Sequence, residues 1–561
     1  MKRLFLSFAF MASFFSLSAQ NEVHHSPRLV VGIMVDQMRW DYLIRYNDRY
    51  CDGGLRRLMT EGYNCNSLLI NYLPAVTAVG HTCAYTGSVP AFTGIIANTM
   101  FIDGKWTTSV RDEGVASVGT NCSNGKDCRA GMASPHRLLV TTMTDELRLA
   151  TNFRSKVISI ALKDRAAILP GGHAANGAFW LDQDNNQFVT SSYYMKQLPQ
   201  WVSDFNRKRL GDKYLAMTTK EKKDTSGYWD LLYPEDTYVQ SAGKKERYYS
   251  PVGSRLIQSP YGNTLTADMA IASLEGEQLG RNADGIPDFL AISFSATDGI
   301  GHQVGPNSPW IEDTYLRLDK DIARILDALD KQVGKGEYAV WLSADHAASH
   351  NVEFRHDHNL PAGTWPYYRY TKDMNDSLRL SFGVKEDFII SFESNNVFFN
   401  DVKIRECCPA GKTFREYKQE VIDRTISLLT EKKEVAYAFQ PSRMPDFLPE
   451  PLRTMVRNGY NPKRSGDIQI ILEANHTEDY DDGYRKDYDG IVKGTQHSVW
   501  SPYDTHIPFI VMGKGIRHAW DNSRHTINDI APTICSILNI QMPSGCVGQA
   551  IDVLGVLPNE K

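Results

Sequence analysis

Short apolar runs that each end close to an aspartate are the feature that most constrains the fold of this chain. Asp36 follows the run VVGIMV, Asp298 follows FLAISFSAT, and Asp345 follows YAVWLSA. Runs of about four to eight residues rich in Val, Ile, Leu and Phe are typical of strands buried on both faces of a parallel sheet. Because ligands of open α/β sheets bind beyond the carboxyl ends of the strands, we expect these carboxylates to converge at one edge.

Further apolar runs extend this pattern along the chain, and helical patterns separate several of them. Core strands are expected at residues 28–36, 64–72, 156–162, 288–295, 338–343 and 506–513. Helices are expected in WIEDTYLRLDKDIARILDALDKQ, in KTFREYKQEVIDRTISLLTEKK and in NDIAPTICSILNI, where Pro532 is tolerable only in the first turn. Strands that alternate with helices predict an α/β fold, a three-layer sandwich around a mostly parallel sheet.

Two stretches interrupt the alternation and are expected to be insertions beside the site. Residues 180–265 are polar and rich in aromatic side chains, and residues 347–480 contain a further helical pattern. A chain of 561 residues exceeds the length of about 250–300 residues beyond which domains usually carry insertions or split. We therefore expect one catalytic domain over residues 21–561 with two cap insertions.

The N-terminal segment has the pattern of a secretory signal peptide over residues 1–20. Lys2 and Arg3 precede an apolar stretch that ends at the small residues Ser18 and Ala19, and this stretch is too short to span a membrane. No cysteine stands at the cleavage point, so no lipid anchor is expected. Removal of the leader makes the formal net charge of −5 two units more negative, which disfavours nucleic-acid binding. We expect a periplasmic or secreted monomer without a membrane anchor.

Nine cysteines in an exported chain permit disulfides. Cys122 and Cys128 would close a short Gly-containing loop in NCSNGKDC, and Cys535 with Cys546 is a plausible second pair. The odd count leaves at least one thiol free or bridged to another chain, and Cys83 in its apolar segment is the first candidate. Because no CxxC pair occurs, a cysteine-ligated metal site is not expected.

Three carboxylates and three imidazoles follow strand ends or lie in a Gly-flanked loop. They are Asp36, Asp298, His302, Asp345, His346 and His497. Such a set can hold two zinc ions, each with an open position for substrate, which points to metal-assisted hydrolysis. Asp298 and His302 are four residues apart and would share one face of a helical turn. Any one of the six, taken alone, is better explained as a helix-capping Asp or a loop His.

Thr77, in NYLPAVTAVGHTCAYTG, is the candidate nucleophile. Pro74 ends the preceding strand, and a helix that begins at Thr77 would direct backbone N–H groups at an incoming anion. Bonding to a zinc ion would lower the pKa of the hydroxyl, although Thr77 taken alone is better explained as a helix N-cap. Asn98, in GIIANTMF, is either a neutral donor to a phosphoryl oxygen or a turn residue.

Lys163 and Arg165 stand two residues apart in ALKDR. On an extended chain that leaves a strand, they would project to the same side. A point cation beside a planar guanidinium suits a dianionic tetrahedral group. A solvated pair that flanks Asp164 is the open alternative.

Together these motifs resemble the alkaline phosphatase superfamily, and most closely its periplasmic phosphate-irrepressible alkaline phosphatases, which have a threonine nucleophile. The resemblance covers nearly all of the chain after the leader and rests on VDQMRWDY, PAVTAVGHTCAYTGSVPAFTGIIAN, ALKDR, FWLDQDNNQFVTSSYYMKQLPQW, SATDGIGHQVGP, SADHA and GTQHSVWSPYDTHIPFIVMG. Thr99 and Met100 depart from the acidic residue and Trp that the family often has there, which puts the local pocket wall in doubt.

The resemblance implies roles for each candidate residue. One zinc ion would be held by Asp298, His302 and His497, and the other by Asp36, Thr77, Asp345 and His346. Asn98, Lys163 and Arg165 would contact the transferred phosphoryl group.

The expected activity is zinc-dependent hydrolysis of small-molecule phosphate monoesters. Thr77 would attack phosphorus to form a phosphothreonine, and water would then release inorganic phosphate. A phosphodiesterase or nucleotide pyrophosphatase of the same superfamily is the main alternative, although Lys163 and Arg165 favour a dianionic monoester. A sulfatase is disfavoured because its Cys- or Ser-x-Pro-x-Arg segment is absent around Thr77. A non-catalytic phosphate-binding or surface interaction protein would be expected to lack Thr77 or a ligand, and none is missing.

Overall fold

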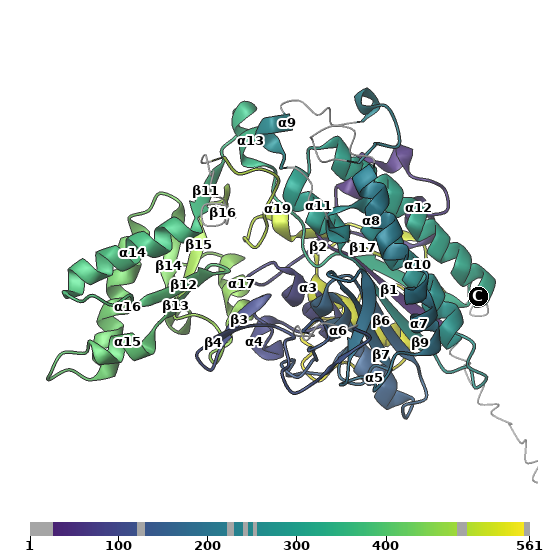
Figure 1. Ribbon diagram of the computed structural model, residues 1–561, viewed down its shortest axis with the longest axis horizontal. Helices are drawn as coiled ribbons and strands as arrows, with labels where there is room; N and C mark the ends of the chain where they lie inside the picture. Colours follow the sequence, from purple (N-terminus) through teal and green to yellow (C-terminus); the bar gives the residue numbers. More distant parts are fainter. Residues whose placement is uncertain are drawn as a thin grey trace, which may run out of the picture.

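A large sheet runs through the body of the protein, with helices on both of its faces (Figure 1). The computed structural model describes residues 26–120, 129–220, 229–238, 245–250, 255–479 and 491–554. The predicted leader at residues 1–20 and the predicted Cys122–Cys128 bridge lie outside the described residues.

Within the described ranges the large sheet has 11 strands and is mostly parallel. In spatial order they are β18 (Ala519–Asp521), β2 (Tyr63–Leu69), β17 (His506–Gly513), β10 (Tyr338–Ser343), β1 (Leu29–Val35), β9 (Asp288–Phe294), β6 (Val157–Ala161), β7 (Gly177–Asp182), β8 (Gln187–Ser191) and β5 (Ser117–Val118), and β19 (His525–Thr526) pairs with β2. All six predicted core strands belong to this sheet. β1 runs parallel to β10 and β9, whereas β17 runs antiparallel to β10 and β2.

The central strands are buried along their whole length. Every residue of β1, β9 and β10 is buried, as continuous apolar runs predict for strands covered on both faces. At Gly32, in the middle of β1, an added Cβ would lie 2.6 Å from the ring of Trp341. A side chain at this position would therefore clash with the Trp341 ring and with the Tyr85 hydroxyl, 2.5 Å away.

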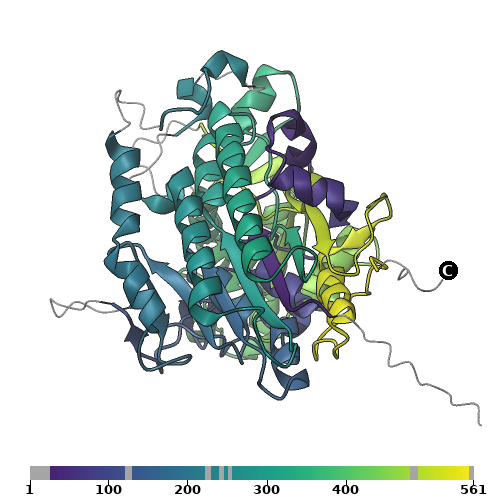
Figure 2. The same cartoon turned by 90° about the vertical axis from the view of Figure 1, so that its right-hand side faces the viewer.

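The two helical layers confirm the predicted sandwich. One face carries α10 (Pro260–Glu277) and α12 (Pro309–Gln332), which pack against each other (Figure 2), and the other carries α3 (Thr77–Thr86) and α6 (Asp164–Gly171). α12 confirms the predicted amphipathic helix. α20 (Ile530–Leu538) confirms another, with Pro532 in its first turn. No helix among the described residues is long and apolar enough to cross a membrane.

Further helices connect the strands. They are α1 (Tyr42–Arg45), α2 (Leu55–Glu61), α4 (Pro90–Thr93), α5 (Met143–Ala150), α7 (Gln200–Arg207), α8 (Leu210–Lys220), α9 (Lys245–Tyr248), α11 (Ala296–Val304), α13 (Val352–Asp357) and α19 (Pro502–Thr505). Short 3₁₀ segments include η5 (Ile527–Asp529).

A second, smaller sheet with its own core lies to one side of the main body (Figure 1). Its strands are antiparallel, in the order β12 (Ile389–Glu393), β13 (Asn396–Phe399), β15 (Ile468–Leu472) and β14 (Val435–Phe439). It carries α14 (Tyr367–Phe382), α15 (Asp401–Glu406), α16 (Phe414–Thr430) and α17 (Leu452–Gly459), and α16 confirms the helix predicted there. A short parallel pair, β11 (Gly363–Pro366) and β16 (His476–Asp479), stands at its boundary.

A β-hairpin contacts both the main body and the small sheet. β3 (Thr99–Ile102) and β4 (Lys105–Thr108) follow Asn98 directly, and their side chains Phe101 and Trp106 pack on Phe398 of the small sheet.

The described cysteines are all unbridged. The predicted Cys535–Cys546 bridge was therefore wrong for this structure. Burial and the nearby Cys546 raise the pKa of the Cys535 thiol, but the two remain free thiols.

Candidate active site

The six predicted metal ligands meet at the carboxyl ends of three adjacent strands. Asp36 follows β1 and Asp345 follows β10, while β9 leads into α11, which carries Asp298 and His302. His497 comes from the loop that precedes α19. The Asp36 and Asp345 side chains are fully buried. The parallel register of β1 with its two neighbours thus brings these distant residues into one cluster.

The ligand atoms fall into two overlapping groups. In each group the atoms lie within 4.8 Å of one another: the first is Asp36, Asp345 and His346, and the second is Asp298, His346 and His497. His302 Nε2 lies 3.1 Å from Asp298 Oδ1, which extends the second group. His346 contributes to both groups and so stands between two candidate metal positions.

The three imidazoles are oriented as metal-binding histidines usually are. His302 Nδ1 lies 2.9 Å from the Thr495 carbonyl oxygen, and His346 Nδ1 lies 3.0 Å from that of Ala347. His497 Nδ1 lies 2.8 Å from the Ala75 carbonyl oxygen. A carbonyl at Nδ1 places the proton there and leaves the Nε2 lone pair available to a metal.

Unpartnered atoms in the cluster also fit a cation. Asp36 Oδ1 and His346 Nε2 are buried without a hydrogen-bond partner, and they lie 3.5 Å apart. Leaving such an atom unpaired costs about 1–3 kcal/mol. Two ligand atoms on one tetrahedral zinc ion would stand roughly 3.4 Å apart, given bond lengths of about 2.1 Å. The observed separation matches that arrangement.

Lys163 lies between two of the carboxylates. Its Nζ is 2.6 Å from Asp36 Oδ2, 2.6 Å from Asp298 Oδ2 and 3.4 Å from Thr77 Oγ1. One lysine does not neutralise the cluster: burial and the neighbouring Asp345 carboxylate raise the pKa of Asp36 well above its usual range. Divalent cations would remove that excess of negative charge.

Thr77 is the first residue of α3 and lies beside this cluster. Its side chain is almost fully buried, and Val76 occupies the N-cap position without a side-chain cap. The N-cap explanation of Thr77 is therefore wrong. Gly80, one turn later, lets α3 approach closely, because an added Cβ would overlap the Asp345 backbone carbonyl. The hydroxyl of Thr77 is thereby held beside the cluster, 3.4 Å from Lys163 Nζ.

Asn98 is fixed by the same helix. Its Oδ1 accepts a hydrogen bond of 2.8 Å from the Ala78 N–H, so Nδ2 remains as a donor next to Thr77. Met100 is fully buried in a core cluster on β3, whereas Thr99 is half-buried. The departure from the family pattern at Met100 therefore falls in the core.

The prediction that Lys163 and Arg165 both lie on an extended chain was wrong. Lys163 has an extended backbone and is the N-cap of α6, whereas Arg165 lies within its first turn. The two cations are still neighbours: burial and the Arg165 charge lower the pKa of Lys163, although the Asp298 and Asp36 carboxylates raise it overall. Arg165 Nε is buried without a hydrogen-bond partner, and its nearest ion pair, with Asp164, is long at 3.7 Å. Its donors are thus largely unused.

Two residues that the sequence did not single out support the cluster. Gln37 has a left-handed backbone (φ 65°), and its Nε2 donates to Asp298 Oδ1 at 2.7 Å. His81 is fully buried and lies 3.2 Å from Asp345 Oδ2. Adjacency to Asp36 could have indicated Gln37, and the four-residue spacing from Thr77 could have indicated His81.

Comparison with known proteins identifies the family of this chain. The sequence pattern of the family "Type I phosphodiesterase / nucleotide pyrophosphatase" matches residues 30–498. Alkaline phosphatase PafA of Elizabethkingia meningoseptica is 43% identical, over 94% of this chain and 95% of the relative. A protein of Myroides odoratus named calcium-transporting ATPase is 42% identical, over 98% and 96%. The crystal structure of wild-type PafA superposes with a TM-score of 0.83 at 40% identity, over 94% of this chain and 99% of that one. The chain therefore belongs to the type I phosphodiesterase / nucleotide pyrophosphatase family, within the alkaline phosphatase superfamily.

Proposed function

We propose that this chain is an alkaline phosphatase that transfers the phosphoryl group of a monoester to Thr77 and then to water. The observation that carries the proposal is the position of the Thr77 hydroxyl. It is buried at the start of α3, 3.4 Å from Lys163 Nζ and beside the carboxylate and imidazole cluster. The relative named alkaline phosphatase PafA, similar over nearly its whole length, supports this activity.

The metal cofactor is proposed to be two zinc ions. Asp36, Asp345, His346 and the Thr77 oxygen would hold one, and Asp298, His302 and His497 the other. A donor set with three imidazoles favours zinc over magnesium. When bound, the two cations would lower the pKa of the Thr77 hydroxyl and stabilise negative charge on the departing ester oxygen.

The chain's own residues position the phosphoryl group. The Thr77 oxygen forms a bond to phosphorus while the bond to the ester oxygen breaks, and water later breaks the phosphothreonine bond. Asn98 Nδ2 would donate to one phosphoryl oxygen, since its Oδ1 is held by the Ala78 N–H. Lys163 and the unused donors of Arg165 would hold the other oxygens. Phosphoryl transfer depends mainly on such positioning and charge stabilisation.

The positive charges of Lys163 and Arg165 also favour monoesters over diesters. A monoester presents a dianionic group, whereas a diester replaces one charged oxygen with a neutral ester oxygen. Buried donors that find no charged partner are left without a stabilising hydrogen bond. This reasoning sets the proposal apart from the phosphodiesterase alternative within the family.

The name of the Myroides odoratus relative is compatible with the same site. The terminal phosphoryl group of ATP is bound through one bridging oxygen and carries two negative charges, so Lys163 and Arg165 could hold it as they would a monoester. ATP hydrolysis by this chain would then be phosphatase action at Thr77, independent of calcium.

Further proposals concern the setting of the enzyme. Residues 1–20 would direct export to the periplasm or beyond, and the mature chain would act as a monomer without a membrane anchor. Residues 180–265 and 347–480 would form insertions in one catalytic domain over residues 21–561.

Thr77→Ala tests the nucleophile. It should retain zinc, form no phosphoenzyme and lose several orders of magnitude in kcat, with residual catalysis from the remaining site. Thr82→Ala is the matched control, because Thr82 lies on the same helix and donates to the Ala78 carbonyl oxygen. The measurement is intact mass after acid quenching, together with turnover. Near-native turnover in Thr77→Ala would remove Thr77 as the nucleophile.

A further inference from the structure

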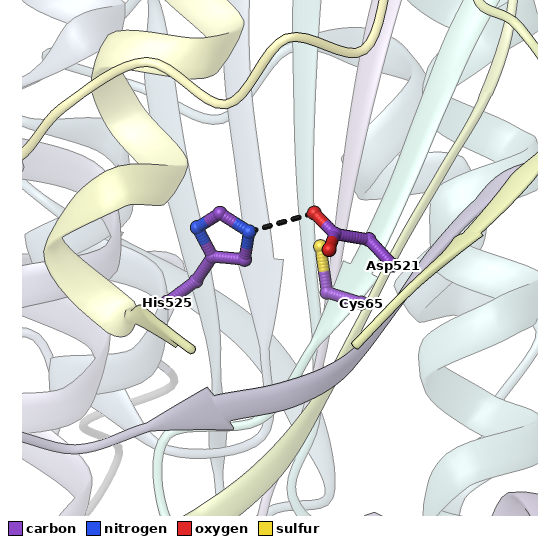
Figure 3. A group of neighbouring side chains, drawn as sticks. All are labelled: Cys65, Asp521 and His525. Carbon is purple, nitrogen blue, oxygen red and sulfur yellow. Dashed lines mark hydrogen bonds and ion pairs between the residues drawn. The ribbon is translucent and has the colours of Figure 1, made fainter. Parts of the chain in front are cut away.

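A third group of metal-ligating side chains lies at the edge of the large sheet, outside the candidate active site. Cys65 on β2, Asp521 on β18 and His525 on β19 point toward one another (Figure 3), with ligand atoms within 4.8 Å of one another. β18 and β19 both pair in parallel with β2, and Asp521 is the register partner of Cys65. Strand register therefore places the three side chains together.

Hydrogen bonds hold the Asp521 carboxylate in place, but none of them involves the Cys65 thiol. Asp521 Oδ2 lies 2.8 Å from His525 Nε2 and accepts from the Tyr63 hydroxyl at 2.8 Å. Asp521 Oδ1 accepts from the Ser523 N–H at 2.7 Å. The Cys65 side chain is 2% exposed and has no hydrogen-bond partner among the described residues. A purely structural Asp–His–Tyr cluster accounts for all of these hydrogen bonds without the thiol, which lies in the main hydrophobic core with its sulfur next to the Asp521 carboxylate.

We propose that Cys65, Asp521 and His525 bind one zinc ion that is separate from the catalytic metals. Thiolate, imidazole and carboxylate are the three ligand types that zinc takes in proteins, whereas magnesium and calcium take oxygen ligands. The His525 and Asp521 side chains keep 19% and 16% exposure, which leaves a path for the ion and a position for water as fourth ligand.

Charge and proton balance are consistent with this assignment. A thiolate and a carboxylate together neutralise one divalent cation. The thiol would give up its proton when the metal binds, as cysteine ligands of zinc do. The His525 proton would move to Nδ1 to free Nε2. Tyr63 and Ser523 would continue to hold Asp521, as outer-sphere partners of metal ligands do.

The position of the site indicates a structural role. The ion would join β2 to the segment that runs through β19 into η5 and α20. η5 and α20 in turn pack against α3, the helix that begins at Thr77. Metal at this edge would therefore stabilise the packing of the C-terminal segment, and Thr77 chemistry would not require it.

Cobalt substitution tests the site independently of the phosphatase activity. Cobalt bound to a thiolate gives a near-ultraviolet charge-transfer band, and the proposed catalytic ligands include no sulfur. Metal-depleted protein reloaded with Co²⁺ should show this band with about three cobalt ions per chain. Cys65→Ser should lose the band and one cobalt, and should retain kcat. Cys535→Ser, which removes another buried free thiol, is the matched control and should keep the band.

Two results would overturn the site. One is wild-type protein that binds cobalt without a sulfur band, and the other is a Cys65→Ser variant that retains the band. His525→Gln is a second test variant, which leaves the Cys65 thiol in place. It should bind one cobalt ion per chain fewer than the wild type. A Thr77→Ala variant that loses kcat but keeps the sulfur band would show that the Cys65 metal site is independent of the phosphatase activity.

Discussion

The imidazole rings of His346 and His497 stack with their centroids 3.6 Å apart and their planes 16° from parallel. Burial lowers the pKa of both, and the neighbouring His346 and His302 rings lower that of His497 further. Both rings are therefore neutral at physiological pH, as metal ligands must be. The stack joins the two candidate metal positions, because His346 would bind one ion and packs against His497, a proposed ligand of the other.

His346→Ala should for this reason lose more metal than His302→Ala. We expect His302→Ala to weaken only the metal position that contains Asp298, whereas His346→Ala removes a ligand of the position that contains Asp36 and also the ring that stacks on His497. The measurement is metal content per chain after gel filtration, with turnover before and after chelation and zinc readdition. Equal and full metal content in both variants would contradict the shared position of His346. Full rate restored by magnesium alone would show that the proposed metal is wrong.

Gly80→Ala should lower both stability and activity. An added methyl group would overlap the Asp345 carbonyl and displace α3, and overpacking of this kind costs about 1–3 kcal/mol. Because Thr77 begins the same helix, kcat should fall more than KM rises. Gly171→Ala is the matched control, since the added Cβ would approach the side chains of Ser159, Ala175 and Ala178 no closer than 3.4 Å. The prediction is wrong if Gly80→Ala and Gly171→Ala have the same kcat and the same free energy of unfolding.

Glu393 should make stability depend on pH. Burial and the nearby Glu478 carboxylate raise the pKa of Glu393 to about 7 from an ordinary 4.5. A carboxyl with a raised pKa binds its proton more tightly in the folded state, so its contribution is complete below about pH 4.5 and is lost as pH rises to about 7. The loss is on the order of 3 kcal/mol at most.

Glu393→Gln should remove that dependence, because the amide does not titrate. The measurement is the free energy of unfolding of both proteins by urea at several pH values between 4.5 and 7. We expect the wild type to lose stability relative to Glu393→Gln as pH rises. A constant difference between the two proteins across this range would exclude the proposed titration.

The core strands and the convergence of the candidate ligands could be predicted because both depend on local patterns. Continuous apolar runs mark β1, β9 and β10, and parallel strands bring Asp36, Asp298 and Asp345 to one edge. The strands β18 and β19 are too short to show any periodicity. Their pairing with β2 therefore could not be predicted.

Other features depend on packing between distant segments. Cys65 meets Asp521 and His525 only through the register of β18 and β19 on β2, and no CxxC motif signals such a site. The contacts of Gln37 and His81 likewise arise once α3 and α11 are in place. The extended path predicted through Lys163 and Arg165 failed because α6 begins at Asp164.

The measurement that tests the phosphatase assignment most directly compares a matched monoester and diester in the wild type and in Lys163→Ala/Arg165→Ala. Removing one charge-assisted hydrogen bond to the phosphoryl group costs about 1.5–3 kcal/mol, or roughly 10- to 100-fold in kcat/KM. We predict that the wild type prefers the monoester by several orders of magnitude. The double variant should lose far more kcat/KM on the monoester than on the diester. A wild-type preference for the diester, or equal losses on both substrates, would contradict the monoesterase assignment and favour a phosphodiesterase.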